Sequence, residues 1–295
     1  MLRFWYFAIA LSIVSFMLAT FTWMSFPVTS DEKYIERYTK SDSEDLADKH
    51  NLHTYFLDLE HGEATLFITP EGKVILIDVG NAKSFSKLQF ILSDLKISKI
   101  DYVFLTTNDI DHVGAFPFLV ESYPIKHVYI PFSDEDNYFS NEIAKALQQT
   151  KNMMLKANKI IEIEKDLKIQ SLYSNPTVLH IKYKQVSSVL MMSDANYDIE
   201  EHLIDNYSDL IKAQILKVGN HGQRLTCTDE FLEIVNPQVA IILGGDVEEN
   251  SRPSYGVIER LTESWIEVYR NDAKGSVKIT FDGEQYEIEA SINGY

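Results

Sequence analysis

The chain is poor in cysteine and in positive charge, and each shortage excludes a class of protein. Cys227 is the only cysteine among 295 residues, so neither an intrachain disulfide nor a cysteine-ligated zinc site can form. The 27 lysines and arginines are outnumbered by 44 aspartates and glutamates, which gives a formal net charge of −17. Because an extended nucleic-acid surface needs clustered basic side chains, we do not expect nucleic acid as a partner.

The remaining composition is that of a folded globular protein. Hydrophobic residues make up 45% of the chain and charged residues 24%, which are ordinary values for a protein with a hydrophobic core. The length allows one large domain or two small ones. Outside residues 30–50, no internal repeat or low-complexity tract stands out.

One long hydrophobic run lies at the amino terminus. Residues 4–26 carry no charge, and as a helix they span about 34 Å, enough for a bilayer core of about 30 Å. Trp5 and Trp23 lie near the two ends, as interfacial aromatic side chains do. We therefore predict a transmembrane signal anchor over residues 1–29, followed by a polar tether over residues 30–51.

The orientation of this predicted anchor follows from its short flank. Arg3 precedes the hydrophobic run, and a basic flank favours the cytoplasmic side of a membrane. Residues 52–295 are then expected on the extracellular side, as the globular domain of a single-pass protein at the cell surface. Val28-Thr29-Ser30 is a weak candidate for a cleavage site, so removal of the anchor stays open.

The most informative stretch is Leu105-Thr106-Thr107-Asn108-Asp109-Ile110-Asp111-His112-Val113-Gly114. It follows an apolar run, residues 102–105, that is typical of a short buried strand. Two carboxylates and an imidazole at the end of a strand suit a metal site, because aspartate and neutral histidine are ordinary ligands of zinc and similar ions. The alternative is an acidic strand-to-helix turn in which Asp111 is the helix N-cap.

Several other polar segments follow predicted buried strands. Binding and catalytic sites collect at the carboxyl ends of strands in α/β proteins. Strands mixed with amphipathic helices, and hairpins near both ends of the globular part, predict two facing mixed sheets covered by helices. The polar segments are residues 78–81, 107–112, 193–196, 219–222 and 244–246. Helices are predicted over residues 84–96, 115–121, 138–158, 196–210, 228–235 and 254–262.

Six segments come in the order found in one known family. The chain resembles the metallo-β-lactamase fold family over roughly residues 52–290, in the branch of the ComEC/Rec2 competence proteins and the bacterial phosphorylcholine esterases. This resemblance implies a four-layer αβ/βα sandwich with a metal site at the sheet edges. The segments are Phe56-Leu57-Asp58-Leu59-Glu60-His61-Gly62-Glu63-Ala64-Thr65-Leu66, Ile75-Leu76-Ile77-Asp78-Val79-Gly80, Leu105 to Gly114, Met192-Ser193-Asp194, Leu216-Lys217-Val218-Gly219-Asn220-His221-Gly222 and Arg252-Pro253-Ser254.

The resemblance also implies a set of metal ligands. Asp111, His112 and His221 match the terminal ligands of one metal, and Asp194 matches the carboxylate that bridges two metals. Asp109 matches a ligand of the other metal. The expected cofactor is zinc, as one or two divalent ions, with manganese or iron as alternatives.

The second metal position departs from the family pattern. Thr107, Asn220 and Arg252 stand where the family has histidines, and a neutral hydroxyl is a poor zinc ligand. This puts the second metal in doubt and leaves one complete site. Asp78 matches a carboxylate that orients the metal loop.

A further segment is expected to line the same cleft. Asp58, His61 and Glu63 match a loop in which the family usually has Gln-Gly-Asp and this chain has His61-Gly62-Glu63.

The function that follows is metal-dependent hydrolysis, with a small anionic phosphoester as the expected substrate. A bound zinc-like ion lowers the pKa of water to about 7 and polarises a phosphoryl oxygen. Asp109 is expected to hold that water and act as base, Arg252 to contact the anionic substrate, and Asn220 to lie beside them.

Two alternatives stay open. A degenerate member of the family would bind one ion and act as a membrane-tethered binding or regulatory module. A purely structural ectodomain would bind no metal, and Arg252 would then have to neutralise the clustered carboxylates of Asp109, Asp111 and Asp194.

Overall fold

The computed structural model describes residues 50–131, 138–185, 187–244 and 253–290. These residues belong to one compact unit, Leu46–Tyr295. The predicted anchor over residues 1–29, nearly all of the tether over residues 30–51, and Arg252 lie outside the described residues. Within the described ranges, no helix is both long enough and apolar enough to cross a membrane.

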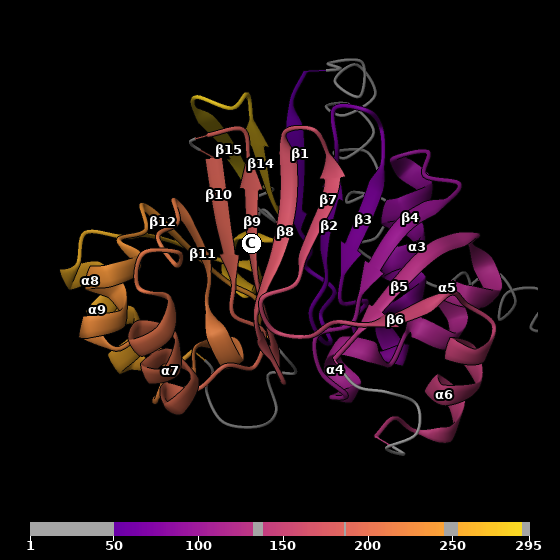
Figure 1. The fold of residues 1–295 in the computed structure, drawn as a ribbon, viewed down its shortest axis with the longest axis horizontal. Coiled ribbons are helices and arrows are strands. Elements are labelled where there is room, and N and C mark those ends of the chain that lie inside the picture. The colour runs from indigo at the N-terminus through magenta and orange to yellow at the C-terminus, as the bar shows by residue number, and fades with distance from the viewer. Residues whose placement is uncertain (1–49, 132–137, 186, 245–252, 291–295) are drawn as a thin grey trace, which may run out of the picture. The chain divides into compact units, whose positions relative to one another are not determined.

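Two β-sheets form the centre of this unit (Figure 1). The first has eight strands in the order β15-β14-β1-β2-β3-β4-β5-β6, and the second has seven in the order β13-β12-β11-β10-β9-β8-β7. The first-sheet strands are β1 (Leu52–Phe56), β2 (Thr65–Ile68), β3 (Val74–Ile77), β4 (Ile100–Phe104), β5 (Ile125–Ile130), β6 (Asn152–Met154), β14 (Val277–Phe281) and β15 (Tyr286–Ala290). Those of the second are β7 (Ile160–Glu164), β8 (Leu167–Ser174), β9 (Thr177–Tyr183), β10 (Ser187–Met191), β11 (Ile215–Lys217), β12 (Val239–Ile242) and β13 (Glu267–Arg270).

Helices connect the strands. The α-helices are α3 (Phe85–Asp94), α4 (Ile110–Val113), α5 (Phe116–Ser122), α6 (Asn141–Gln148), α7 (Tyr197–Tyr207), α8 (Asp229–Val235), α9 (Tyr255–Glu263) and α10 (Asn271–Lys274). Two 3₁₀ turns, η2 (Ala82–Ser84) and η4 (Gly219–Gly222), follow β3 and β11.

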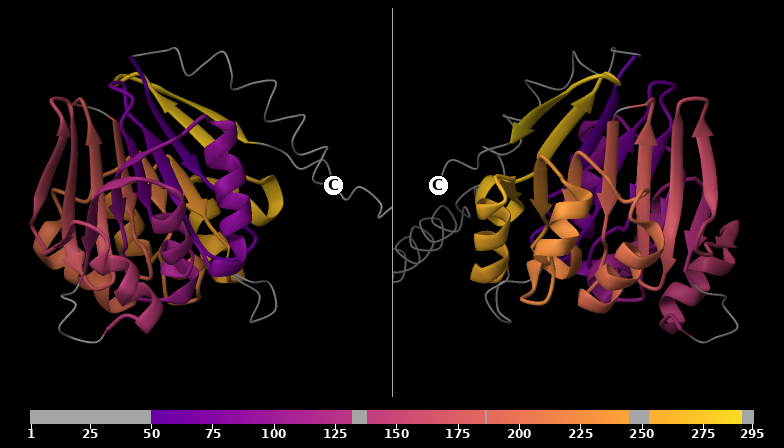
Figure 2. Two further views of the ribbon diagram at one scale, coloured as in Figure 1. Left: turned by 90° about the vertical axis from the view of Figure 1, so that its right-hand side faces the viewer. Right: turned by 60° about the vertical axis from the view of Figure 1, so that its left-hand side comes forward.

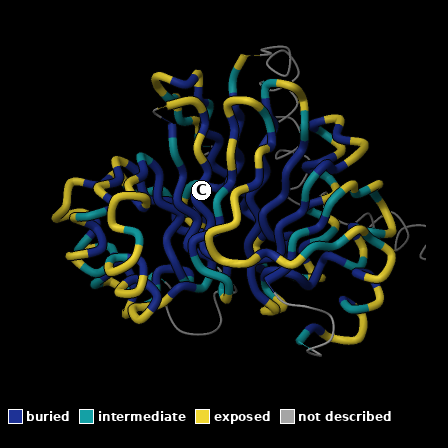
Figure 3. Tube along the Cα trace, in the orientation of Figure 1, coloured by how far each residue is buried: buried dark blue, intermediate teal, exposed yellow. Residues whose placement is uncertain are grey.

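The side chains between the two sheets form the central core. Successive residues of a strand point to opposite faces, so each sheet presents one row of apolar side chains to the other. Phe56 and Phe104 of the first sheet and Ile181 and Ile215 of the second are almost completely buried in this shared cluster. The inner strands of both sheets are accordingly mostly buried, whereas the edge strands β6, β7, β13 and β15 are partly exposed (Figure 3).

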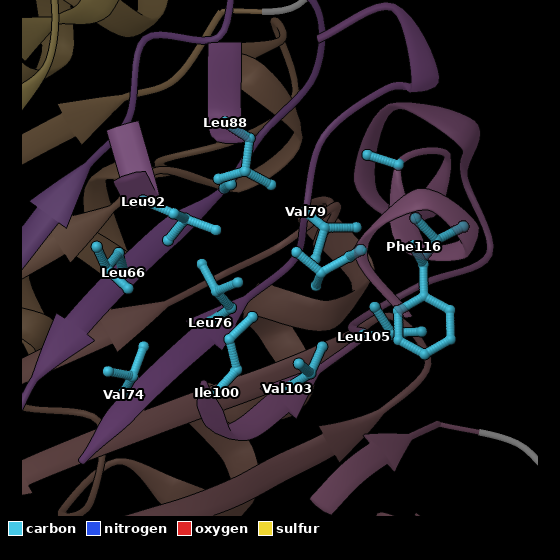
Figure 4. Packing of buried hydrophobic residues seen from close by; sticks show 14 of the residues in the cluster. Leu66, Val74, Leu76, Val79, Leu88, Leu92, Ile100, Val103, Leu105 and Phe116 are labelled. Atoms are coloured by element: carbon cyan, nitrogen blue, oxygen red, sulfur yellow. The ribbon is translucent and has the colours of Figure 1, made fainter. Parts of the chain in front are cut away.

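Helices cover the outer face of each sheet. Leu88 of α3, Phe116 of α5 and Leu147 of α6 pack with strand residues of the first sheet, and Figure 4 shows part of this cluster. Helices α7, α8 and α9 pack in the same way on the second sheet, and the right-hand view of Figure 2 brings them forward. The predicted four-layer αβ/βα arrangement is therefore confirmed.

The topology brings the predicted polar segments to one edge. Strands β3, β4 and β5 are parallel neighbours in the first sheet, and β10, β11 and β12 are parallel neighbours in the second. Carboxyl ends of parallel strands lie at a common edge. Residues 78–81, 107–112, 193–196 and 219–222 follow β3, β4, β10 and β11 at those ends.

The long helix predicted over residues 138–158 is wrong. Helix α6 ends at Gln148, and β6 follows four residues later. The hydroxyl of Thr150 and the side-chain amide of Asn152 both donate to the carbonyl of Leu147, each at 2.9 Å. These side chains satisfy a carbonyl at the end of the helix, so the chain turns there into an edge strand.

A buried carboxylate braces the segment that leads into α8. Glu200 of α7 is 1% exposed and accepts hydrogen bonds from the backbone N–H groups of Cys227, at 2.6 Å, and Thr228, at 3.0 Å. The guanidinium of Arg260 donates to the carbonyls of Thr226 and Cys227, both at 2.7 Å. Burial disfavours the charged carboxylate and, despite these hydrogen bonds and Arg260, raises the pKa of Glu200 to about 7.

The central core yields a first prediction. Phe104→Ala would empty a fully buried position whose ring stacks on Tyr129 at a centroid distance of 4.8 Å. We expect it to lower the free energy of unfolding by about 3–5 kcal/mol, measured by urea denaturation. The matched control is Phe118→Ala on α5, whose side chain is 45% exposed and should cost less than about 1 kcal/mol. Equal losses for the two variants would contradict the packing described here.

A second prediction concerns pH. The pKa of Glu200 is about 7 in the folded chain and about 4.3 in an exposed glutamate. Between about pH 4.3 and pH 7 the folded chain therefore keeps a proton on Glu200 that the unfolded chain has lost. The stability that Glu200 contributes is therefore present at low pH and lost as the pH rises toward 7. Urea denaturation of wild type and Glu200→Gln between pH 5 and 8 should show wild type losing stability relative to the non-titrating variant. Parallel curves would rule this out.

Candidate metal centre

His112 is held by a buried carboxylate. Its Nδ1 lies 2.7 Å from Oδ2 of Asp78, the residue directly after β3. Thr106 donates its backbone N–H to Oδ1 of Asp78 at 2.8 Å and its hydroxyl to Oδ2 at 2.6 Å. A carboxylate at Nδ1 fixes the orientation of a metal-binding imidazole and raises its basicity. The other ring nitrogen, Nε2, lies 3.1 Å from Oδ1 of Asp194.

His221 faces the same carboxylate from the second sheet. Its Nδ1 lies 3.1 Å from the carbonyl oxygen of Leu243, which follows β12. Its Nε2 lies 3.8 Å from Oδ1 of Asp194. Both imidazoles therefore present Nε2 to Asp194, and each has a partner at Nδ1. The two rings are 5.8 Å apart, centroid to centroid.

The backbone at this edge is strained. Asp78, Ser193, Asn220 and His221 have φ values of 57°, 48°, 45° and 53°, in the left-handed region that costs a non-glycine residue about 1–2 kcal/mol. The N–H of Asn220 donates to the carbonyl of Ser193 at 2.8 Å, which joins the two strained segments. Such strain persists only where the surrounding structure enforces it, and here it falls on the residues that converge.

Glu63 enters the same cluster from the segment before β2. Its N–H donates to the carbonyl of Asp111 at 2.9 Å. A Cβ at Gly62, where φ is 84°, would lie 2.1 Å from that same carbonyl oxygen. Only glycine allows this approach, so Gly62 brings Glu63 against the turn that carries His112.

The Glu63 carboxylate lies between a lysine and the two imidazoles. Oε2 accepts a short hydrogen bond from Nζ of Lys217 and lies 3.9 Å from Nε2 of His112. Oε1 lies 2.8 Å from Nδ1 of His221. Each oxygen of Glu63 is thus in close contact with a nitrogen, Oε2 with Lys217 and Oε1 with His221.

The charges in this cluster shift one another's pKa values. Burial would raise the pKa of Glu63, but Lys217 and His221 outweigh it and lower the pKa to about 2. Burial would lower the pKa of His112, but Asp78 and Asp194 outweigh it and hold the pKa well above its usual value. His112 and His221 in turn hold the pKa of Asp194 below its ordinary range. The carboxylates of Glu63 and Asp194 are therefore ionised at neutral pH.

A small cavity lies behind the cluster, between the sheets. Its volume of about 10 Å³ has room for roughly one water molecule. The lining residues are Glu63, Thr65, Ile77, Asp78, Thr106, Met191, Ser193 and Lys217. A single water there would have several polar partners, so the cavity belongs to the same buried polar network.

Of the five predicted metal ligands, His112, Asp194 and His221 converge. Asp109 is exposed and caps α4 by accepting the backbone N–H of Asp111 at 2.9 Å, so the N-cap is Asp109 and not Asp111. One oxygen of Asp111 accepts the side-chain amide of Asn81 at 2.8 Å. The ligand roles of Asp109 and Asp111 stay predictions.

Three residues stand where the family has histidines: Thr107, Asn220 and Arg252. Thr107 is buried at the end of β4, and its hydroxyl lies 3.4 Å from the N–H of Asp109. Asn220 donates its side-chain amide to Gln223 at 3.2 Å. Arg252 lies outside the described residues, so its contact with substrate stays a prediction.

From the sequence alone, Lys217 has no assigned role, and Glu63 is expected to line the cleft without being named as a ligand. Lys217 is 1% exposed and is the last residue of β11. Because successive residues of a strand face opposite sides, its side chain lies on the same face of the sheet as that of Ile215, toward the central core. The available signal was a lysine inside the apolar run of residues 213–218, because a charge there needs a buried partner.

These residues fit a divalent cation. One atom each from Glu63, His112 and His221 lies within 4.8 Å of the others, and Asp194 adds a second carboxylate to the same group. Two ligands that each lie about 2.1 Å from one ion are roughly 3–3.5 Å apart, close to the separations of 3.1–3.9 Å between Nε2 atoms and carboxylate oxygens found here.

Comparison with known proteins agrees with this geometry. Residues 60–140 match the family model of the metallo-beta-lactamase superfamily. ComE operon protein 3 of Bacillus subtilis is 24% identical over 254 residues, which cover 76% of this chain and 32% of that protein. The chain spans a third or less of the length of the curated relatives that it matches.

Solved structures show the same fold. A metal-dependent hydrolase of the beta-lactamase superfamily aligns with a TM-score of 0.51 at 13% identity, over 75% of this chain and 96% of that one. A diphosphatase from the PhnP family aligns with a TM-score of 0.52 at 11% identity, over 78% and 97%. The chain therefore has the metallo-β-lactamase fold, which implies divalent metal binding, and it resembles the competence proteins of the ComEC/Rec2 type.

Proposed function

We propose that this chain is a metal-dependent hydrolase that acts on a small phosphoester. The observation that carries the proposal is the convergence of His112 and His221 on Asp194, with Nε2 of each ring at 3.1 and 3.8 Å from the same carboxylate oxygen. The fold supports hydrolysis in general. The narrower choice of a phosphoester is supported by the resemblance to phosphorylcholine esterases and by the diphosphatase of the same fold.

Each residue has a separate part in this proposal. His112 and His221 would hold the ion through Nε2, while Asp78 and the Leu243 carbonyl keep both rings oriented. Asp194 would bind the ion beside them. A bound divalent ion supplies a water of lowered pKa and polarises a phosphoryl oxygen.

Proton transfer and substrate binding fall to residues at the rim. Asp109, exposed at the start of α4, accepts a proton from the attacking water. Arg252 binds an anionic oxygen of the substrate. Asn220 lies beside His221 and completes the rim. Residues 4–26 anchor the chain in a membrane and place the hydrolase at the cell surface.

A second function is favoured by one observation. Thr107 and Asn220 provide no imidazole at the second metal position, and two-metal clamping ordinarily stabilises the attacking and leaving oxygens together. A chain with one ion and slow turnover would serve as a membrane-tethered binding or regulatory module.

The third prediction concerns metal content. The full-length chain, purified in detergent without chelator, should hold about one equivalent of zinc, manganese or iron by elemental mass spectrometry, because one complete ligand set is present. A screen of phosphomonoesters and phosphodiesters then separates hydrolase from binding module. No metal after reconstitution with each ion would overturn both functions.

The fourth prediction concerns Asp194. Asp194→Asn keeps the size of the side chain and removes its charge, so we expect metal affinity and phosphoester hydrolysis to fall by about 100-fold or more. Isothermal titration with Zn²⁺ and steady-state kinetics measure the two. The control is Asp198→Asn, an exposed aspartate in the first turn of α7, which should change neither. Hydrolysis that survives the loss of metal would contradict a metal-dependent mechanism.

A further inference from the structure

We propose that Glu63 is a ligand of the metal ion and that Lys217 supplies a fixed second positive charge, so that the centre is complete with one divalent ion. This inference rests on the metal-binding part of the proposed function and is independent of the substrate. The ligands assigned from the family resemblance include neither Glu63 nor Lys217.

The two oxygens of Glu63 have different surroundings. Oε2 accepts the short hydrogen bond from Lys217. Oε1 lies 2.8 Å from Nδ1 of His221, the ring nitrogen that also faces the Leu243 carbonyl. Oε2 lies 3.9 Å from Nε2 of His112, and one atom of Glu63 lies within 4.8 Å of a ring nitrogen of each imidazole. The Glu63 carboxylate is therefore within reach of an ion that the two imidazoles hold.

Backbone contacts rather than side-chain flexibility put Glu63 in place. The N–H of Glu63 is fixed on the Asp111 carbonyl, and Gly62 allows the close approach. The Glu63 side chain is 3% exposed, whereas that of Asp194 is 23% exposed. The two carboxylates therefore differ in depth, with Glu63 on the interior side of the cluster and Asp194 toward solvent.

Lys217 is a buried charge whose main partner is Glu63. Its side chain is 2% exposed, and besides Glu63 its Nζ lies 3.5 Å from the carbonyl of Ser193. A lysine in the core between two sheets is expensive unless it is paired. Its position at the end of β11, two residues after the apolar Ile215, holds the charge at the base of the metal cluster.

The charges of this buried cluster balance with one divalent ion. Three carboxylates, Glu63, Asp78 and Asp194, contribute three negative charges, and Lys217 contributes one positive charge. The remainder is two negative charges when the imidazoles bind as neutral ligands. One divalent ion neutralises it, whereas a second would exceed the charge of these three carboxylates and would need Asp109 and Asp111, which lie nearer to solvent.

The first experiment tests Glu63 as a ligand. In the full-length chain we expect one equivalent of Zn²⁺ by isothermal titration, and an affinity at least 30-fold lower in Glu63→Gln. The d–d absorption of bound Co²⁺ should also change in position and intensity, because a ligand has been lost. The control is Glu60→Gln on the same segment, where the carboxylate is 71% exposed and neither readout should change.

The second experiment tests whether the charge of Lys217 acts on the ion directly. The direction in which Zn²⁺ affinity changes in Lys217→Met decides the question. If Lys217 is a fixed cation beside the ion, Lys217→Met should bind Zn²⁺ about tenfold more tightly, because a like charge is removed, and Lys217→Arg should stay near wild type. If Lys217 merely supports Glu63, Lys217→Met should bind more weakly. If Lys217→Met does not fold, the double variant Glu63→Gln/Lys217→Met removes both charges of the buried pair. We then compare its Zn²⁺ affinity with that of Glu63→Gln and expect the double variant to bind Zn²⁺ more tightly.

The outcomes separate this inference from the proposed function. Wild-type affinity and an unchanged Co²⁺ spectrum in Glu63→Gln would overturn the ligand role, and two equivalents of Zn²⁺ in wild type would overturn the single-ion centre, whatever the enzyme hydrolyses. Conversely, one equivalent of metal and the expected variant effects, with no turnover of any phosphoester, would refute the proposed hydrolase and leave this inference standing.

Discussion

The structure depends most on how it compensates charges that it buries. Asp78, Glu63 and His112 are almost inaccessible to water, and burying such groups singly would cost several kcal/mol each. Asp78 is satisfied by Thr106 and His112, and Glu63 is paired with Lys217. Because these partners come from both sheets, the polar network at the edge is intact only when the two sheets are packed together.

This dependence links the stability of the fold to the chemistry of the site. The apolar rows between the sheets, with Phe104 and Ile215 among them, set the spacing at which His112 and His221 face Asp194. The strained backbone at Ser193 and His221 is tolerated because this packing enforces it. The resulting cluster holds more negative than positive charge, which is the electrostatic condition for attracting a divalent cation.

Much of the site was predictable from residue types and order. Residues 107–112, 193–196 and 219–222 follow buried strands, and parallel strands bring such segments to one edge. The resemblance to the metallo-β-lactamase fold family then identified His112, Asp194 and His221 within them as ligands. Asp109 and Asp111 show the limit of this reasoning, since a carboxylate after a strand can equally well cap a helix. Asp109 does cap α4, and one oxygen of Asp111 is engaged by Asn81.

The sequence by itself determined the alternation of strands and helices, the four layers and the group of acids and imidazoles, because hydrophobic periodicity and strand-end polarity are local properties. Only the tertiary structure decided which charges are partners. Residues 154 positions apart, Glu63 and Lys217, meet because β2 and β11 belong to different sheets that pack face to face. Likewise, α6 ends at Gln148 because Thr150 and Asn152 bond to the Leu147 carbonyl. That contact between specific side chains is not visible in the periodicity that predicted a longer helix.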